Sequence, residues 1–330
     1  MLKGNEMIIV RSPLRITLGG GGTDLPSYAN NYEGFCISAT ISKYSYVAIN
    51  HSFFEGINLK YSKDENVHSV GYIEHPVFRE ALKWIRLKTP QIEIVSVADV
   101  PSNGAGLGNS GAFTVALLKA LCGYKNIPYS QEQIAELACD INMVRLGKTQ
   151  GKQDEYASAI GGINAFTFKR DGSVGYRHLK IEHDTLVELE ENLMLFYTGV
   201  AHDTESILKY QEKLTKEEPD MVSSLHLVKD QGLISETCLE QGNLNSFAKS
   251  LNEQWALKEA RMPEGSAYLR NVHDETLKNG SLGTKIVGSG NGGFFMCYAN
   301  DKAKLRKYFK EQGMGELRFS FDFEGVKRMV

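Results

Sequence analysis

Apolar residues in the first part of the chain fall in short runs with partial alternation, a pattern typical of β-strands. These runs occupy residues 7–12, 35–41, 44–50 and 56–62. They predict a mainly antiparallel sheet. Residues 75–88 instead carry apolar side chains at helical spacings behind a proline, which the first turn of a helix tolerates. A helix is therefore expected to follow the sheet.

Strand-like and helix-like segments continue to about residue 180. A strand over 92–100 leads through a glycine-rich loop into a helix-like run at 112–121. A second helix is predicted over 130–147, with Ser130 as its N-cap and Gln133 three positions later, the spacing of a capping box. A hairpin, residues 161–179, completes this part. The pattern predicts an α+β domain.

A charged stretch at 180–193 is the nearest feature to a domain boundary. We place the division between residues 1–185 and 186–330. The second part has its own strands and helices: a strand at 192–199, helices across 203–278, a strand pair around 284–299, a helix at 300–313 and a last strand at 315–323. It is also expected to be α+β.

The composition favours a globular protein that acts on small molecules. The 330 residues are 42% hydrophobic and 23% charged, enough for one large or two moderate domains. The formal net charge of −3 shows no basic excess. Nucleic acid and an anionic membrane surface are therefore poor candidates for the partner. The composition leaves the oligomeric state open.

Cysteine usage and the N-terminus favour a cytoplasmic protein. The five cysteines are odd in number and scattered, without the C-x-x-C spacing of a zinc site. The first residues lack the apolar core of a signal peptide, and no run approaches the ~18 apolar residues of a membrane span. We expect a reduced, soluble protein that is not exported.

Three glycine clusters need one explanation: "GGGG" at 19–22, "GAGLGNSG" at 104–111 and "GSGNGG" at 288–293. The last two contain G-x-G-x-x-G. A dinucleotide fold would follow the helix with a parallel strand ending in an acidic residue, but here a turn and another helix come next. The lysine of a Walker A loop is also absent. What remains is a glycine loop whose backbone N–H groups can bind phosphate at a helix N-terminus.

Four motifs in order resemble those of the GHMP small-molecule kinases: "SPLRITLGGGGTDLP" at 12–26, "PSNGAGLGNSGAF" at 101–113, "GKQDEYASAIGG" at 151–162 and "KIVGSGNGGFF" at 285–295. The resemblance runs from about residue 8 to the end. It implies an N-terminal domain like ribosomal protein S5, a ferredoxin-like C-terminal domain, and ATP with Mg²⁺ in the cleft between them.

By resemblance, the second motif holds the ATP phosphates with its backbone N–H groups. The residues assigned to this cofactor site are Gly104, Ala105, Gly106, Leu107, Gly108, Asn109 and Ser110. Ser110 would also give its hydroxyl to Mg²⁺, although the same residue could serve only as a helix N-cap.

The third and first motifs supply the expected catalytic pair. Asp154 corresponds to the general base, which orients the acceptor hydroxyl and accepts its proton. Arg15 would lie beside it and stabilise charge on the transferred phosphoryl group. An arginine inside an apolar strand is costly unless it is paired, which independently favours a carboxylate partner.

Substrate contacts are expected around the first and last glycine clusters. Asp24 matches the position that hydrogen-bonds sugar hydroxyls, although a turn aspartate also has an easy structural role. Gly22, Thr23 and Gly290 are assigned to the same substrate site. The loop at 288–293 would close the site from the C-terminal domain.

Three asparagines depart from the family pattern. Asn109 replaces the first serine of a serine pair, Asn142 stands where many members have a Mg²⁺-binding glutamate, and Asn291 interrupts the last glycine run. An amide lacks the charge of a carboxylate, so metal binding at Asn142 should be weak. Asp140 cannot replace it, because two positions along a helix point to roughly opposite sides.

Within the family, the resemblance implies transfer of phosphate from ATP to the anomeric hydroxyl of a sugar phosphate, D-glycero-D-manno-heptose 7-phosphate, on the way to nucleotide-activated heptose for surface glycans. Such a site should hold at least one Arg or Lys besides Arg15. A kinase for fucose or galactose stays an alternative, as does a catalytically weakened sensor of sugar phosphates or nucleotides.

Overall fold

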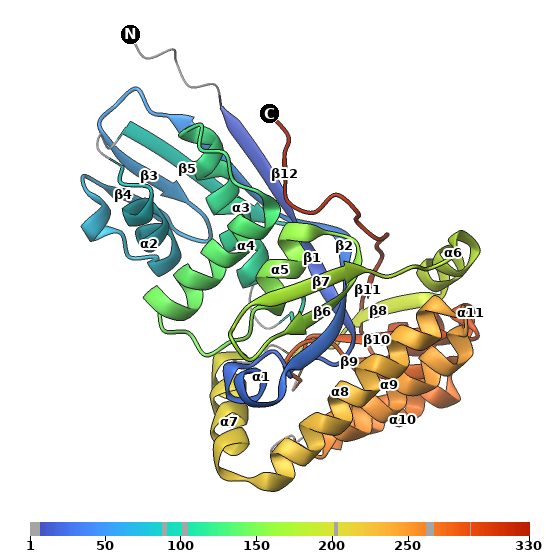
Figure 1. Cartoon of the computed structure of the whole chain (residues 1–330). Coiled ribbons are helices and arrows are strands. Elements are labelled where there is room, and N and C mark those ends of the chain that lie inside the picture. Colours follow the sequence, from blue (N-terminus) through green and yellow to red (C-terminus); the bar gives the residue numbers. More distant parts are fainter. Residues whose placement is uncertain (1–6, 88–90, 101–104, 201–203, 262–266, 291) are drawn as a thin grey trace.

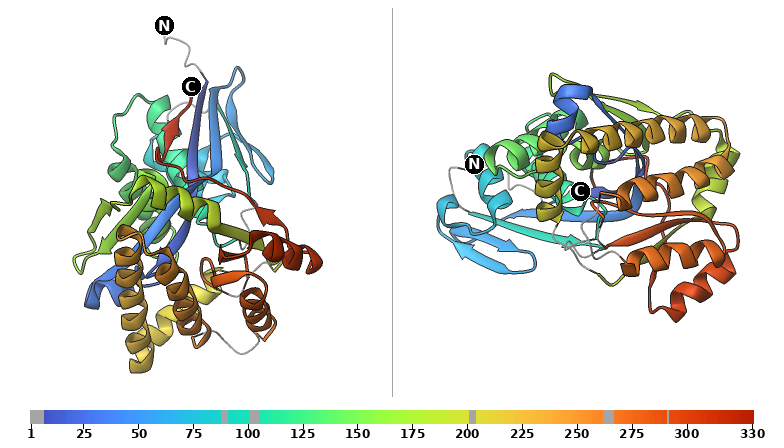
Figure 2. Two further views of the ribbon diagram at one scale, coloured as in Figure 1. Left: turned by 90° about the vertical axis from the view of Figure 1, so that its right-hand side faces the viewer. Right: turned by 90° about the horizontal axis from the view of Figure 1, so that it is seen from below.

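The computed structural model describes residues 7–87, 91–100, 105–200, 204–261, 267–290 and 292–330. The chain forms two units side by side, each with its own sheet (Figures 1 and 2). The N-terminal unit carries a long twisted sheet with helices on one face. The C-terminal unit places a group of helices against a smaller sheet. The mixed α+β architecture predicted from the sequence is confirmed.

The larger sheet has eight strands: β1 (Ile8–Gly19), β2 (Gly34–His51), β3 (Gly56–Lys60), β4 (Asp64–Val67), β5 (Gln91–Ala98), β6 (Ile163–Phe168), β7 (Val174–His178) and β12 (Lys327–Arg328). Its order is β12-β1-β2-β5-β3-β4, with β6 on β2 and β7 beyond β6. Every pairing is antiparallel except β3 with β5. The mainly antiparallel sheet is therefore confirmed, although the two predicted runs at 35–41 and 44–50 form one strand, β2.

The N-terminal helices are α1 (Pro26–Tyr32), α2 (Pro76–Trp84), α3 (Asn109–Tyr124), α4 (Gln131–Cys139) and α5 (Gln153–Ile160). Helix α3 is buried on nearly all sides and packs on β1 and β2. The predicted capping box of Ser130 and Gln133 is present at the start of α4. The predicted second helix is interrupted, however, because residues 140–145 form a π-helical turn.

The C-terminal unit contains α6 (His183–Asn192), β8 (Leu193–Tyr197), α7 (Thr204–Glu217), α8 (Pro219–Glu240), α9 (Leu244–Glu259), α10 (Ala267–Lys278), β9 (Ser281–Ile286), β10 (Phe294–Ala299), α11 (Lys302–Glu311) and β11 (Glu316–Leu317). The sheet order is β11-β8-β10-β9, and all pairs are antiparallel. In chain order this is 4-1-3-2 with helices after the first and third strands, the arrangement of a ferredoxin-like fold.

The end of the chain returns to the N-terminal sheet. The predicted last strand over 315–323 is confirmed only at Glu316–Leu317, which pair with β8. Beyond them Phe321 bridges to Ile41, and β12 pairs with β1. Phe319 and Phe321 of this segment pack against a hydrophobic core to which both units contribute, whereas Phe323 is exposed. The sheets divide around α6, and the boundary between residues 185 and 186 stays a prediction.

Two further sequence inferences bear on the described residues. All five cysteines are free and buried, so they form no disulfide framework. No helix in the described part of the chain is long and apolar enough to cross a membrane.

Candidate active site

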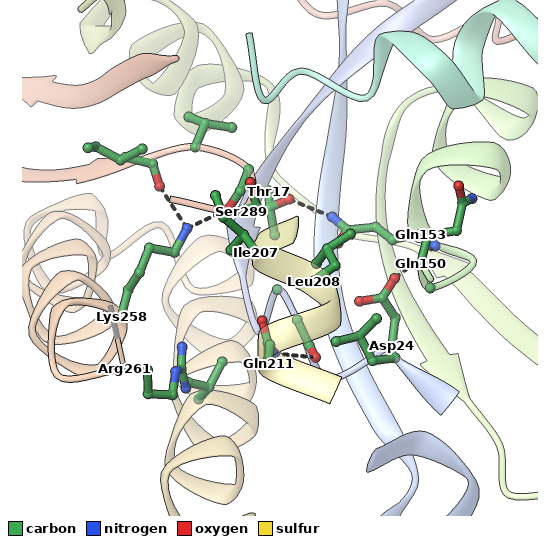
Figure 3. A pocket seen from close by; sticks show the side chains of 18 of the residues that line it. Thr17, Asp24, Gln150, Gln153, Ile207, Leu208, Gln211, Lys258, Arg261 and Ser289 are labelled. Atoms are coloured by element: carbon green, nitrogen blue, oxygen red, sulfur yellow. Dashed lines mark hydrogen bonds between the residues drawn. The ribbon is translucent and has the colours of Figure 1, made fainter. Parts of the chain in front are cut away.

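A pocket opens between the two units, with an empty volume of about 1190 Å³ that includes its open mouth. Its walls come from β1, the turn after β1, the start of α5, helices α7 and α9, and the loop after β9. Figure 3 shows Lys258 and Arg261 on one side and Asp24, Gln150 and Gln153 on the other. Elements far apart in the sequence therefore converge on one cavity.

Arg15 and Asp154 form an ion pair in this pocket. The Arg15 Nε and Nη2 atoms lie 2.8 and 2.6 Å from Asp154 Oδ1, and Nη1 donates to the Gly106 carbonyl at 2.6 Å. Arg15 is buried in β1, whereas Asp154 is about one-third exposed in the first turn of α5. The pairing expected for a buried arginine is present, and within the described part of the chain the second carboxylate oxygen of Asp154 accepts no hydrogen bond.

Glycines around this pair make the close approach possible. A Cβ on Gly108 would lie 3.0 Å from Arg15 Cγ, and one on Gly111 would lie 2.7 Å from Asp154 Cβ. Gly108 also has a φ of 74°, the left-handed region that glycine adopts readily. The second glycine motif therefore packs directly against the ion pair.

Asp24 is a second carboxylate of the same pocket. Its Oδ2 accepts the Gln153 backbone N–H at 3.2 Å, and a Cβ on Gly151 would collide with it. Burial, followed by the nearby Asp154 charge, raises the pKa of Asp24 to about 6. At neutral pH Asp24 can accept hydrogen bonds from a polyhydroxy ligand, and near pH 6 it holds a proton part of the time.

Two glycine loops touch each other above the ion pair. A Cβ on Gly106 would lie 2.7 Å from the Val287 carbonyl oxygen, and one on Gly288 would lie 2.5 Å from Gly106 Cα. The Leu107 carbonyl accepts the Arg15 N–H at 2.9 Å. This contact brings the loop after β9 beside the predicted phosphate loop. Gly104, assigned to the phosphate loop, lies outside the described residues, as does Asn291.

The start of α3 corrects one interpretation. Helix α3 begins at Asn109 with Gly108 as its N-cap, so Ser110 is not the N-cap. Ser110 is exposed in the first turn, whereas the Asn109 side chain is buried and donates to the Val100 carbonyl at 2.8 Å. Ala105 and Leu107 are buried beneath the loop.

The remaining predicted substrate residues differ in position. Gly22 lines the pocket and accepts a hydrogen bond from Gln211 of α7 through its carbonyl at 3.3 Å. Thr23 is buried, and its hydroxyl exchanges hydrogen bonds with the Phe35 backbone, which fixes the turn. Gly290 is buried and lies outside the pocket lining.

Ser110, the Mg²⁺ ligand expected from the sequence, lies beside a lysine, and its assignment to the metal stays a prediction. The Lys148 ammonium lies 2.9 Å from Asn142 Oδ1 and 3.5 Å from Ser110 Oγ, so a cation already contacts both oxygens. No group of three or more His, Cys, Asp or Glu side chains in the described ranges could hold a metal ion. A second cation between these two oxygens would be repelled by the ammonium.

Glu155 lies beneath this lysine. It is fully buried, its Oε1 accepts from Asn142 and from Gln150 at 2.9 and 2.6 Å, and its Oε2 has no hydrogen-bond partner among the residues that the structure describes. Burial, followed by the Asp154 charge, raises the pKa of Glu155 to about 7. Burial lowers the pKa of Lys148. Asn142 donates to Glu155 and to Thr114, so buried hydrogen bonds connect α5 to α3.

Sequence reasoning missed the basic residues of the pocket: Lys258, Arg261 and Lys285. Lys285 stands in an apolar strand, the same signal that identified Arg15. Lys258 continues the buried stripe of α9 by helical spacing, one turn after Gln254. A charged residue within an apolar strand could have identified Lys285, and a charged residue at the end of a buried helical stripe could have identified Lys258.

Two family descriptions match the chain. Residues 72–162 match the GHMP kinases N terminal domain, and residues 235–313 match the GHMP kinases C terminal domain. A D-glycero-alpha-D-manno-heptose 7-phosphate kinase of Campylobacter jejuni is 28% identical over 98% of this chain and 98% of its own.

Solved structures share the fold. A crystal structure described as a D-glycero-D-manno-heptose 1-phosphate kinase from Bacteroides thetaiotaomicron has a TM-score of 0.82 and 24% identity, covering 98% of this chain and 99% of the other. A Lactococcus lactis galactokinase in complex with galactose has a TM-score of 0.76 and 15% identity, covering 99% and 95%.

Proposed function

The chain belongs to the GHMP kinase family, and on this premise we propose that it is a sugar kinase that transfers phosphate from ATP to the anomeric hydroxyl of D-glycero-D-manno-heptose 7-phosphate. The product would be the 1,7-bisphosphate, which serves the synthesis of nucleotide-activated heptose for surface glycans. The full-length likeness to a heptose 7-phosphate kinase supports this choice of substrate.

The observation that carries the proposal is the Arg15–Asp154 pair, which lies against the predicted phosphate loop at one end of the pocket. Phosphoryl transfer needs a positioned acceptor hydroxyl and charge stabilisation, with little covalent chemistry by the protein. The free Asp154 oxygen would orient the hydroxyl and accept its proton. Arg15 fixes the carboxylate and adds positive charge beside the transferred group.

Other pocket residues take supporting roles. Asp24 would accept hydrogen bonds from sugar hydroxyls, and Gly22 would shape the wall beside it. Gly106 and Gly108 would let backbone N–H groups approach the ATP phosphates. When bound with ATP, Mg²⁺ would neutralise phosphate charge. Ser110 would be its protein ligand, in competition with Lys148, which contacts the side-chain oxygens of Ser110 and Asn142.

A substrate panel tests the proposal. We expect kcat/KM for heptose 7-phosphate, under saturating ATP and Mg²⁺, to exceed the values for free heptose, galactose and fucose by about 100-fold or more, because unpaired buried cations disfavour a sugar without the phosphate. Equal or better efficiency with an unphosphorylated sugar would contradict the heptose assignment.

Lys148 favours a second candidate, a sensor that binds sugar phosphate or nucleotide without turnover. The lysine contacts both residues that the family pattern assigns to the metal. ATP turnover separates the two candidates: a sensor would bind ATP and sugar phosphate but release no ADP with any sugar of the panel.

A further inference from the structure

The pocket has two chemically different ends. Asp24 and Asp154, both from the N-terminal unit, lie at the end beside the start of α5. Lys258 and Arg261 lie at the other end, on and just after α9 (Figure 3). Lys285 of β9 also lines the pocket. The catalytic roles proposed above use the acidic end, and no residue of the basic end has yet been assigned to a part of the substrate.

None of the three basic side chains has a carboxylate partner among the described residues. Lys258 Nζ donates to the backbone carbonyls of Ile286 and Gly288 at 3.0 and 2.6 Å. Arg261 Nη1 donates weakly to the Ser224 hydroxyl at 3.3 Å. Burial and neighbouring cations, not anions, dominate their surroundings. Neighbouring cations repel one another. A bound anion would relieve this repulsion and stabilise the charged side chains.

The three residues differ in how much charge they can offer. Burial lowers the pKa of Arg261 only to about 10, so this side chain stays charged at neutral pH. Burial, together with Arg261, lowers the pKa of Lys258 to about 7. Burial lowers the pKa of Lys285 well below its ordinary value, and its ammonium group donates to Gln254 Oε1 at 2.5 Å. Arg261 is therefore the permanent cation.

Donor groups remain for a ligand at this end. A lysine ammonium has three N–H donors, and Lys258 uses two of them on backbone carbonyls. The guanidinium of Arg261 has five donors in a planar fork, which matches the oxygens of a phosphate. Among the described residues Arg261 makes one weak side-chain hydrogen bond, to Ser224, and its other N–H donors have no partner there.

We infer that Arg261, with Lys258 beside it, binds the phosphate that the acceptor sugar already carries before the reaction. This inference rests on the proposed function and assigns the part of the site that selects a phosphorylated sugar. The sugar then spans the pocket, with its reacting hydroxyl at Asp154 and its existing phosphate at α9. A phosphate dianion supplies the negative charge that the basic end lacks.

The test compares variants on two substrates that differ only in the phosphate. Arg261→Gln should lower kcat/KM for heptose 7-phosphate by about 100-fold, because a charge-assisted bidentate contact is lost, and leave kcat/KM for free heptose nearly unchanged. Lys258→Met should act in the same direction. Lys249→Gln is the matched control, because Lys249 is exposed on the same helix.

Equilibrium binding gives a second readout that does not depend on turnover. Titration calorimetry with heptose 7-phosphate, in the absence of ATP, should show the affinity loss in Arg261→Gln and partial recovery in Arg261→Lys. The melting temperature of each variant shows whether it is folded. If Arg261→Gln fails to fold, Lys258→Met carries the same comparison.

The outcomes separate this inference from the proposed function. If the unmodified protein shows no preference for the phosphorylated sugar, the heptose 7-phosphate proposal fails, and this inference fails with it. If the preference exists but both variants keep it, the inference is overturned and the function stands. Equal losses with both sugars, together with a raised KM for ATP, would assign the basic end to the nucleotide and also overturn it.

Discussion

The acidic and basic ends of the pocket are built in different ways. At the acidic end, Asp154 pairs with Arg15, and Asp24 accepts a backbone N–H, so the groups are held before any ligand arrives. At the basic end, Lys258 and Arg261 have no carboxylate partner among the described residues. The first arrangement fixes geometry for chemistry. The second keeps charge available for recognition.

The difference implies different kinetic signatures. A prepositioned carboxylate acts chiefly on the chemical step, so its loss should appear in kcat. A cation that meets a remote phosphate should contribute to binding, so its loss should appear in KM unless the binding energy also positions the reacting hydroxyl. Variants at the two ends therefore separate chemistry from recognition.

The largest effect is expected for Asp154→Asn. The amide keeps the shape but cannot accept the hydroxyl proton, so kcat should fall by about 100-fold or more while ATP affinity changes little. Steady-state kinetics and an ATP titration measure both quantities. Near-normal turnover would remove Asp154 from the mechanism. Asp171→Asn, at an exposed turn, is the control.

The sequence predicted the acidic end and missed the basic end for a physical reason. Arg15, Asp24 and Asp154 lie in glycine-rich motifs whose backbone shape is local, and glycines such as Gly108 and Gly151 are needed for contacts at those residues. Site residues in such glycine-rich motifs can therefore be predicted from a short stretch of sequence.

The basic end depends on tertiary packing. Lys258 is one of many lysines on amphipathic helices, and only the approach of α9 to the loop after β9 places it at the pocket. The same limit explains the segment after Leu317, which was predicted to continue a strand but whose Phe321 instead bridges to Ile41 of the N-terminal sheet. It also explains Lys148, whose contact with Asn142 depends on the loop before α5.

Gly106→Val should weaken ATP binding by about 10-fold or more. Gly106 has a left-handed φ that valine adopts poorly, and the valine side chain would block the approach of the backbone N–H groups to phosphate. In this chain the substituent would also collide with the Val287 carbonyl and separate the two glycine loops. Fluorescence or calorimetric titration of ATP measures the change.

A matched variant isolates the site effect from backbone strain. Gly172 has a φ of 81°, and a Cβ at this position would meet no atom within 4 Å, so Gly172→Val carries similar strain without the collision. Both variants should lose melting temperature, but only Gly106→Val should lose ATP affinity. Unchanged ATP affinity in Gly106→Val would leave the loop with a packing role alone.

At the basic end, recognition should depend on pH. Lys258 has a pKa of about 7, so it is charged below that pH and neutral above it. A sugar phosphate is mostly a dianion above about pH 6. KM for the phosphorylated sugar should therefore be lowest between about pH 6 and 7 and rise up to about 10-fold by pH 8.5. Lys258→Met should flatten this rise, whereas Arg261→Gln should retain it but move it to higher pH, because the Arg261 charge helps to lower the pKa of Lys258.

The smallest effect concerns stability, where the two ends should respond to pH with opposite sign. Glu155, buried beneath the acidic end, has a pKa of about 7 in the folded chain against an ordinary value of 4.5. Between pH 4.5 and 7 the Glu155 carboxyl is ionised in the unfolded chain but still protonated in the folded chain. The free energy of unfolding therefore falls as pH rises. Lys258 has a folded pKa of about 7 against an ordinary value of 10.5. Between pH 7 and 10.5 Lys258 is charged in the unfolded chain but neutral in the folded chain. The contribution of Lys258 to the free energy of unfolding therefore rises with pH.

Denaturant unfolding at a series of pH values measures these contributions. Glu155→Gln keeps an acceptor for Asn142 and Gln150 but cannot ionise, so it should gain about 1–3 kcal/mol relative to the unmodified protein between pH 4.5 and 7. Glu182→Gln, at an exposed position, should show no such pH-dependent gain. Lys258→Met should instead gain stability at neutral pH, and this advantage should shrink toward pH 10.5. A pH-independent difference for both variants would mean that neither group changes its protonation on unfolding, and the contrast between the two ends would then rest on ligand binding alone.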